Sequence, residues 1–235
     1  MKKLHTLTGI LAVLSVLVIL LITAIEIAAY SDWSYYEKEY TKLGVPETVD
    51  MTMDDLMDVT QEMMAYLRGN RDDLVVMTTV AGEEREFFND QEKFHMSEVR
   101  TLFLGGLALR KIALAVLLFC VLFLLFSHAP LSRILPVYYQ RGSVLFVVIV
   151  GILAALFASD FTKYFTIFHE IFFRNDLWLF DPATSLMINM LPETFWVDIA
   201  LRVALLFVGL MAACFAGCAV WRILAKRRAK TNTLT

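Results

Sequence analysis

The sequence predicts an all-α integral membrane protein in which four transmembrane helices carry a small extracytoplasmic α+β cap. Three observations support this fold class. Of the 235 residues, 58% are hydrophobic and 18 are Phe, which exceeds the apolar share of about 45–50% in an ordinary soluble protein. The chain also has four apolar stretches long enough to cross a bilayer, and its charges are distributed asymmetrically between them. A water-soluble protein of this size could not bury that much apolar surface.

The membrane helices are expected at four apolar stretches, since about 20 helical residues cross a bilayer. The stretches cover about residues 7–29, 107–127, 143–168 and 197–222. The first follows Lys2 and Lys3 and could be a secretory signal, but it is longer than the ~7–15 residues of a signal core. We therefore interpret residues 1–29 as an uncleaved first transmembrane helix. Arg110 and Lys111 lie near one end of the second stretch, where long basic side chains can reach the membrane interface.

The charges between these stretches predict the orientation. Residues 1–6, 128–142 and 222–235 together carry nine Lys or Arg and no acidic residue, whereas residues 31–98 carry seventeen Asp or Glu against six Lys or Arg. Cytoplasmic segments of membrane proteins are enriched in Lys and Arg. Both termini, the loop 128–142 and the basic tail 223–235 are therefore expected in the cytoplasm. The short basic tail suits anionic lipid, and we expect no binding to nucleic acid.

Two outward segments are expected, a cap at residues 30–106 and an interfacial loop at residues 169–196. In the cap, apolar residues at helical spacing predict a helix over residues 50–67, with Thr52 as its N-cap. A β-hairpin is expected around Ala81-Gly82, followed by a helix that begins near Asp90 and continues into the second membrane stretch. In the loop, an apolar segment at 186–192 is too short to cross the bilayer, and we expect a re-entrant or interfacial helix there.

Ionisable residues within the apolar stretches gather at the outward level. Such residues are costly in a membrane and often functional. The four are Glu26, Asp160, Lys163 and Arg202. Their common depth predicts a polar pocket beneath the cap, although ordinary ion pairs and interfacial anchors remain an alternative.

Two histidines are expected at the same outward level. His95 precedes the second membrane stretch and His169 follows the third. Imidazole titrates near neutral pH and suits general acid–base catalysis, so the pair is the candidate catalytic site; surface or capping roles are the alternative. The cysteines Cys120, Cys214 and Cys218 lie in apolar runs, which indicates neither a disulfide framework nor a zinc motif.

Three strings of the sequence fit one family pattern: FHEIFFRNDLW at 168–178, EKFHMSEV at 92–99 and LPETFW at 191–196. In these strings the sequence resembles the bacterial lipoprotein intramolecular transacylases. The resemblance is specific at the two histidine motifs and looser elsewhere. Tyr35-Tyr36 and Glu39-Tyr40 also fit the family pattern. Ser97-Glu98 departs from it, because Asp-Val or a similar acidic pair is expected after the first histidine.

The resemblance implies the reaction. The family moves the sn-2 acyl chain of a diacylglyceryl cysteine, at the N-terminus of a bacterial lipoprotein, to the α-amino group of the same cysteine. His95 and His169 would then be the catalytic acid and base. Partners would be the diacylated lipoprotein N-terminus and membrane lipid, with no cofactor, and two isolated histidines make a poor metal site. The expected substrate-binding residues are Glu26, Tyr36, Arg100, Asp160, Lys163, Phe165, Phe172, Arg174, Trp178 and Arg202.

Two other classes of function stay open at this stage. A phospholipid or lipoprotein hydrolase, or an acyltransferase between two molecules, could use the same histidines. A four-span scaffold without enzymatic activity would use them only as structural caps. A separation of more than ~12 Å between the two side chains would favour the scaffold, because proton transfer needs hydrogen-bond reach or one bridging water.

Overall fold

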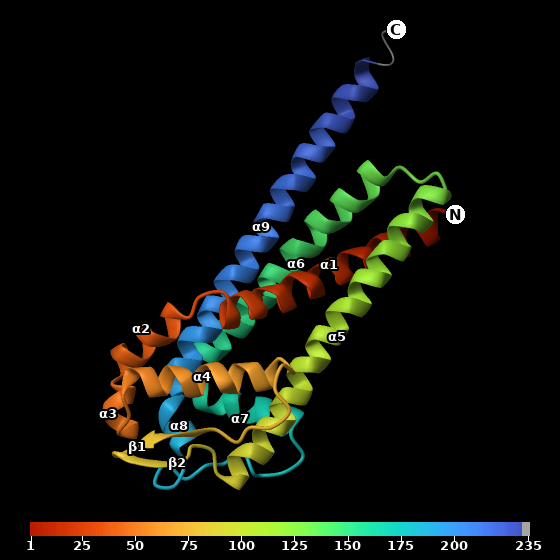
Figure 1. The fold of residues 1–235 in the computed structure, drawn as a ribbon. Helices are drawn as coiled ribbons and strands as arrows, with labels where there is room; N and C mark the ends of the chain where they lie inside the picture. The colour runs from red at the N-terminus through yellow and green to blue at the C-terminus, as the bar shows by residue number, and fades with distance from the viewer. Residues whose placement is uncertain (232–235) are drawn as a thin grey trace. The chain divides into compact units, whose positions relative to one another are not determined.

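The computed structural model describes residues 1–231 of the chain, and side chains up to residue 228. Within this range the chain forms nine helices and one two-stranded sheet (Figure 1). The part of the expected basic tail beyond residue 231 lies outside the described residues. Four helices in the described range are long and apolar enough to cross a membrane. They are α1 (Lys2–Tyr30), α5 (Asp90–Phe126), α6 (Leu131–Ser159) and α9 (Glu193–Thr231).

The contacts divide the chain into two compact units. The first contains residues 1–26, 108–155 and those from 203 onward; the second contains residues 27–107 and 156–202. The division falls inside all four long helices. The first unit therefore consists mainly of apolar helix, and the second holds the remaining elements.

The first unit has a narrow core and an apolar outer surface. Leu17, Tyr139 and Phe207 are among its buried residues, and the Tyr139 hydroxyl donates to the Met211 carbonyl at 3.0 Å. At Gly142 a Cβ atom would lie 2.7 Å from Val13 Cγ1, so the two helices approach closely only because this residue is glycine. Large side chains elsewhere in the unit are exposed, for example Phe119, Leu145 and Leu205. Such exposure suits helices whose solvent is lipid.

The second unit is built on a continuous apolar core. Its short helices are α2 (Ser34–Leu43), α3 (Val45–Val49), α4 (Met53–Leu67), α7 (Phe161–Phe172) and α8 (Leu186–Met190). Tyr40, Leu56, Phe87, Phe88 and Met190 are fully or almost fully buried in this core. Met190 belongs to α8, so residues from the expected interfacial loop pack in the same core as the expected cap.

The structure confirms the predicted helix α4 and the predicted hairpin. Thr52 caps α4, because its side chain accepts a hydrogen bond from Asp55 N at 3.1 Å. The strands β1 (Met77–Val80) and β2 (Glu83–Glu86) pair antiparallel with Val80 opposite Glu83. Between them Ala81 and Gly82 have φ values of 54° and 79°. Positive φ at both central residues is the conformation of the type I′ turn, whose twist matches that of a hairpin.

The third apolar stretch differs from its expected form. Residues 143–168 were expected as one helix, but α6 ends at Ser159 and α7 begins at Phe161. Asp160 has φ −163° and ψ 85°, and its carboxylate accepts a hydrogen bond from Lys163 N at 3.1 Å. The carboxylate thus caps a new helix, which hydropathy cannot reveal because the surrounding residues stay apolar. The expected loop 128–142 is likewise helical from Leu131 onward, since α6 extends beyond its apolar portion.

Candidate active site

Helix α5 begins with a capping box that fixes the turn before His95. Glu92 N donates to Asn89 Oδ1 at 3.0 Å, and Asn89 N donates to Glu92 Oε2 at 2.7 Å. These reciprocal bonds satisfy backbone donors that a helix start leaves without partners. His95 lies in the next turn, and its side chain is buried.

Helix α7 presents the second histidine at its last turn. Its N-terminus is capped by Asp160, and it ends where Phe173 adopts extended backbone. His169 is buried, and its Nδ1 lies 2.8 Å from the carbonyl oxygen of Phe165, one turn earlier. A carbonyl oxygen can only accept, so His169 Nδ1 carries the proton and Nε2 is the free basic nitrogen of the neutral ring.

The two histidine rings lie side by side. Their centroids are 5.9 Å apart and their planes differ by 27°. His95 is 6% exposed and His169 is 7% exposed. Two cationic imidazoles at this distance would repel each other, so the pair favours states with at most one extra proton.

Aromatic rings surround the pair. Phe173 and Phe180 lie 4.9 Å and 5.5 Å from the His95 ring centroid. Phe165 and Trp178 lie 4.2 Å and 4.7 Å from that of His169. Burial among these rings lowers the pKa of His169 from its usual value, and the hydrogen bond to Phe165 opposes this shift. His169 is therefore a neutral base at neutral pH.

Three side chains near the start of α5 form hydrogen bonds with the segment that follows α7. Gln91 Nε2 donates to the carbonyl oxygens of Leu177 and Leu179 at 3.0 and 3.1 Å. Glu92 Oε1 accepts from Ser185 Oγ at 2.5 Å and from Met187 N at 3.0 Å. Asn175 Nδ2 donates to Glu98 Oε1 at 2.8 Å. We call Phe173–Ser185 the α7–α8 loop; these contacts hold its aromatic residues against α5.

Of the predicted site residues, Phe165 and Trp178 contact a histidine directly. Phe172 packs on Phe168 and is half exposed. Tyr36 is buried in the core, where its hydroxyl donates to the Ala29 carbonyl at 3.0 Å. Arg174 is exposed and follows α7 by two residues.

The other predicted charged residues have contacts elsewhere. Glu26 lies in the first unit and pairs with Arg110. Asp160 caps α7, and Lys163 Nζ lies 5.7 Å from the ring centroid of the neighbouring Tyr164. Arg100 donates to the Asp72 carbonyl and covers the Tyr66 ring. Arg202 pairs with Asp32 at 3.4 Å and covers the Tyr35 ring. Their role in substrate binding stays a prediction.

Several residues of the site were not predicted from the sequence. They are Gln91, Glu92, Glu98, Phe173, Asn175 and Phe180. The spacing of Asn89 and Glu92 is that of a capping box and could have indicated Glu92. The partners of Gln91 and Glu98 lie 77 to 88 positions away in the sequence, and no local pattern indicates such contacts.

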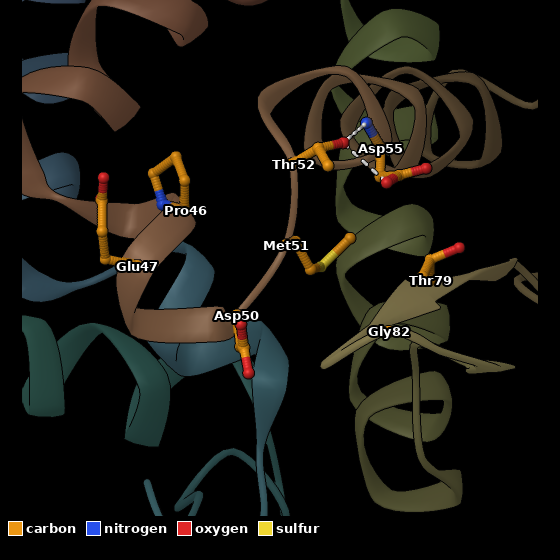
Figure 2. A pocket seen from close by; sticks show the side chains of 8 residues that line it. All are labelled: Pro46, Glu47, Asp50, Met51, Thr52, Asp55, Thr79 and Gly82. Carbon is orange, nitrogen blue, oxygen red and sulfur yellow. Dashed lines mark hydrogen bonds between the residues drawn. The ribbon is translucent and has the colours of Figure 1, made fainter.

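A separate acidic hollow lies beside the hairpin turn and shares no residue with the histidine site. Its volume is about 410 Å³, and it is lined by Pro46, Glu47, Asp50, Met51, Thr52, Asp55, Thr79 and Gly82. Figure 2 shows the carboxylates of Glu47, Asp50 and Asp55 around it, with Asp55 bonded to Thr52. Its lining offers no imidazole for acid–base chemistry.

Comparison with known proteins identifies the family. A sequence model of the lipoprotein intramolecular transacylase family, Lit, matches residues 10–196. The chain belongs to the Lit family. The match spans both histidines and every contact of the candidate site, and none of the curated proteins compared matches the sequence.

Solved structures of a Lit protein share the fold. The membrane integral lipoprotein intramolecular transacylase Lit from Bacillus cereus is 19% identical, with a TM-score of 0.69 and 100% of both chains covered. A form of that protein with one histidine replaced by arginine is 22% identical, with a TM-score of 0.75 and 98% of this chain and 96% of that chain covered. A form with alanine at the same position has the same identity and TM-score over 97% of both chains.

Family membership and the fold establish the general character of the protein. As a Lit family member it is an acyltransferase, a lipoprotein intramolecular transacylase. Its four apolar helices and membrane-integral neighbours make it a multi-pass membrane protein.

Proposed function

We propose that the chain transfers the sn-2 acyl group of a diacylglyceryl-cysteine lipoprotein to the α-amino group of that cysteine, with His95 and His169 as paired acid–base catalysts. The observation that carries this proposal is the 5.9 Å separation of two buried imidazoles. At this distance both rings reach one substrate, and a single water can bridge them. The distance disfavours a non-enzymatic scaffold, whose function would not require the two imidazoles to lie close together.

His169 is the general base in this proposal. Its Nδ1–H is held by the Phe165 carbonyl, which leaves Nε2 to take a proton from the substrate amine. A backbone carbonyl in this position also fixes the orientation of the ring. The lowered pKa of His169 keeps the ring unprotonated before the reaction begins.

His95 stabilises the charge that develops on the ester. The amine nitrogen attacks the ester carbonyl carbon while His169 removes one amine proton, and an N–H of His95 donates to the carbonyl oxygen as it becomes an oxyanion. When the carbon–oxygen bond breaks, the glycerol oxygen receives a proton from the histidine pair. The products are an amide at the cysteine nitrogen and a free sn-2 hydroxyl, and the proton content of the pair is unchanged.

The aromatic surroundings favour transfer over hydrolysis. Phe165, Phe173, Trp178 and Phe180 leave little polar surface for a water nucleophile beside the rings. An apolar site also suits an acyl chain, and it orients an amine and an ester that belong to one molecule. Such intramolecular orientation can contribute about 7–11 kcal/mol. No side chain of the enzyme needs to form a covalent intermediate.

We place the reaction on the extracytoplasmic side, with both termini in the cytoplasm. The support is the charge distribution: the basic segments 1–6, 128–142 and 222–235 fit the cytoplasmic side, and the acidic segment 31–98 fits the outside. Arg100, Lys163, Arg174 and Arg202 would add positive potential for the lipid headgroup region. Glu26, Tyr36, Asp160 and Phe172 remain proposed substrate-binding residues.

The decisive experiment is expression in a bacterium that lacks this activity. Mass spectrometry of the N-terminal peptide of one lipoprotein should show an N-acylated cysteine with one acyl chain on the glyceryl group. The acyl mass lost from the glyceryl group should equal that gained by the nitrogen. A peptide with one acyl chain, a free amine and released fatty acid would instead identify a hydrolase.

A further inference from the structure

Glu98 is a partly buried acidic residue close to His95 for which the reaction outlined above has no use. Glu98 lies three residues after His95 on α5, which places both side chains on one face of the helix. Asn175 Nδ2 donates to its Oε1 at 2.8 Å. Asn175 lies in the α7–α8 loop, three residues before Trp178, whose ring contacts His169. Glu98 therefore lies in the wall formed by α5 and this loop.

The amide of Asn175 has a defined orientation. Asn175 Oδ1 accepts a hydrogen bond from Leu177 N at 2.9 Å, so its nitrogen must be the atom that faces Glu98. The amide holds one carboxylate oxygen in place while the loop backbone holds the amide. The carboxylate is thus fixed by its surroundings and does not rotate freely.

The other carboxylate oxygen has no partner. Glu98 Oε2 is buried and accepts no hydrogen bond from the residues that the structure describes. The basic residues nearest to it on α5 have other contacts. Lys93 pairs with Glu86 and Asp90. Arg100 Nη1 donates to the Asp72 carbonyl and its guanidinium covers the Tyr66 ring, whereas its Nε, like Glu98 Oε2, is buried without a partner among the described residues. A buried carboxylate oxygen without a donor is unfavourable, so this atom is suited to a donor that arrives with a ligand.

The substrate of the proposed reaction brings one strong donor to this site. The ester and acyl chains carry only acceptors, whereas the α-amino group of the terminal cysteine carries two or three N–H bonds and can be positively charged. We propose that Glu98 Oε2 accepts a hydrogen bond from this α-amino group and holds it beside the histidines. Glu98 is then a substrate-binding residue that takes no proton and leaves the bond changes to the histidine pair.

This inference rests on the proposed transacylase reaction and adds a basis for specificity. After transfer the nitrogen is an amide with one N–H and no charge, so its bond to the carboxylate is weaker. A site built to bind a charged or multiply donating amine rejects a ligand that lacks it. Glu98 would therefore favour lipoproteins with a free N-terminus over N-acylated ones and would promote release of the product.

Binding of two lipopeptides to the purified full-length protein tests this role. Both contain a dialkylglyceryl cysteine whose ether links prevent turnover; one has a free α-amine and the other is N-acetylated. We expect the wild-type protein to bind the free amine at least ten times more tightly. Glu98→Gln keeps an oxygen for Asn175 but replaces the acceptor by an NH₂ group, so the preference should disappear while affinity for the N-acetylated form stays within about twofold.

Glu170→Gln is the matched control. Glu170 is exposed and adjacent to His169, and its replacement removes the same charge. This variant should retain the wild-type preference for the free amine. Equal binding of both lipopeptides by the wild-type protein would overturn the inference without any variant. The inference would also be overturned if Glu98→Gln kept the wild-type preference for the free amine, or if it lost affinity for both lipopeptides equally. Should Glu98→Gln not fold, Glu98→Asp must weaken only free-amine binding.

The proposed reaction is tested separately with the ester-linked lipopeptide. Conversion by the wild-type protein without any binding preference would contradict the role of Glu98 alone. A binding preference without conversion would contradict the proposed reaction alone.

Discussion

At the scale of single residues, the two histidines differ although both are buried imidazoles. His169 has one nitrogen bonded to the Phe165 carbonyl, whereas His95 Nδ1 is buried and has no partner among the described residues. A nitrogen that the protein leaves without a partner is available to the substrate, to a bridging water or to the other ring. The difference supports separate roles in one reaction.

Removal of either histidine should abolish most of the activity. We expect His95→Ala and His169→Ala each to lower the rate of N-acyl lipoprotein formation by about 10²–10⁴-fold, the usual contribution of a positioned acid or base. The double variant should lose little more than the worse single variant, because groups that act as one unit are strongly non-additive. The rate is measured by mass spectrometry at matched protein levels. A wild-type rate in either single variant would contradict the catalytic role of the histidines. As a control, Glu170→Gln should keep the wild-type rate.

The burial of His169 predicts how stability depends on pH. Its pKa in the folded protein lies below the usual 6.5, mainly because of burial, so the unfolded chain takes up the proton first as the pH falls. The contribution of His169 to the free energy of unfolding should be fully present above about pH 6.5 and should be lost as the pH falls through the lowered pKa. The difference in Tm between pH 7.5 and pH 5.0, measured in detergent, should be smaller in His169→Gln than in the wild-type protein. An equal difference in both would mean that folding does not lower the pKa of His169.

At the scale of elements, the Glu92 side chain links α5 to α8 by hydrogen bonds. It is fully buried and accepts hydrogen bonds from Asn89 N, Ser185 Oγ and Met187 N. Glu92→Ala should destabilise the protein by about 2–5 kcal/mol, because it leaves buried donors without acceptors. A thermal unfolding scan measures the loss. As a control, Glu84→Ala removes an exposed carboxylate of β2 and should change stability by less than about 0.5 kcal/mol. Similar effects of Glu92→Ala and Glu84→Ala would contradict the proposed role of Glu92 in linking the two helices.

The hairpin turn offers an opportunity for stabilisation. Ala81 has φ 54°, a conformation that costs energy for alanine and that asparagine adopts more readily. Ala81→Asn should stabilise the hairpin by about 0.5–1 kcal/mol, because asparagine adopts the left-handed conformation at a lower cost than alanine. The gain should be seen as slower hydrogen exchange of the Phe87 amide, which donates to the Val76 carbonyl. Ala65→Asn, in the last turn of the right-handed helix α4, should instead destabilise the protein. Faster exchange in Ala81→Asn would contradict the turn assignment.

Elements with a local cause could be predicted from the sequence, and those with a distant cause could not. The cap of α4 at Thr52 and the hairpin turn at Ala81-Gly82 could be predicted from neighbouring residues. The break at Asp160 was missed, because continuous apolar residues on both sides masked a single capping carboxylate. Charge and hydropathy predicted a common depth for the two histidines. Their contact and the hydrogen bonds of Gln91, Glu92 and Glu98 to the α7–α8 loop and α8 depend on packing between segments far apart in the chain.

At the scale of the whole molecule, the proposed orientation is open to a direct test. Asn70 and Arg133 are both exposed, and the charge distribution predicts them on opposite sides of the membrane. In a variant without Cys120, Cys214 and Cys218, a cysteine at Asn70 should react with a membrane-impermeant reagent in intact cells. A cysteine at Arg133 should react only after the cells are permeabilised. The reverse result would invert the orientation and place the histidines on the cytoplasmic side.

The contacts between α5 and the α7–α8 loop have a consequence for biosynthesis. Gln91, Glu92 and Glu98 bond to residues that lie 77 to 95 positions later in the chain. Both histidines are translated before Asn175 and Met187, so a nascent chain that ends at α7 contains the whole catalytic pair but none of these hydrogen bonds. Long-range contacts of this kind form slowly because a long loop must close first. The growing chain is therefore expected to stay inactive in the membrane until its final helix begins to emerge, so a transacylase truncated during translation would not act on lipoproteins.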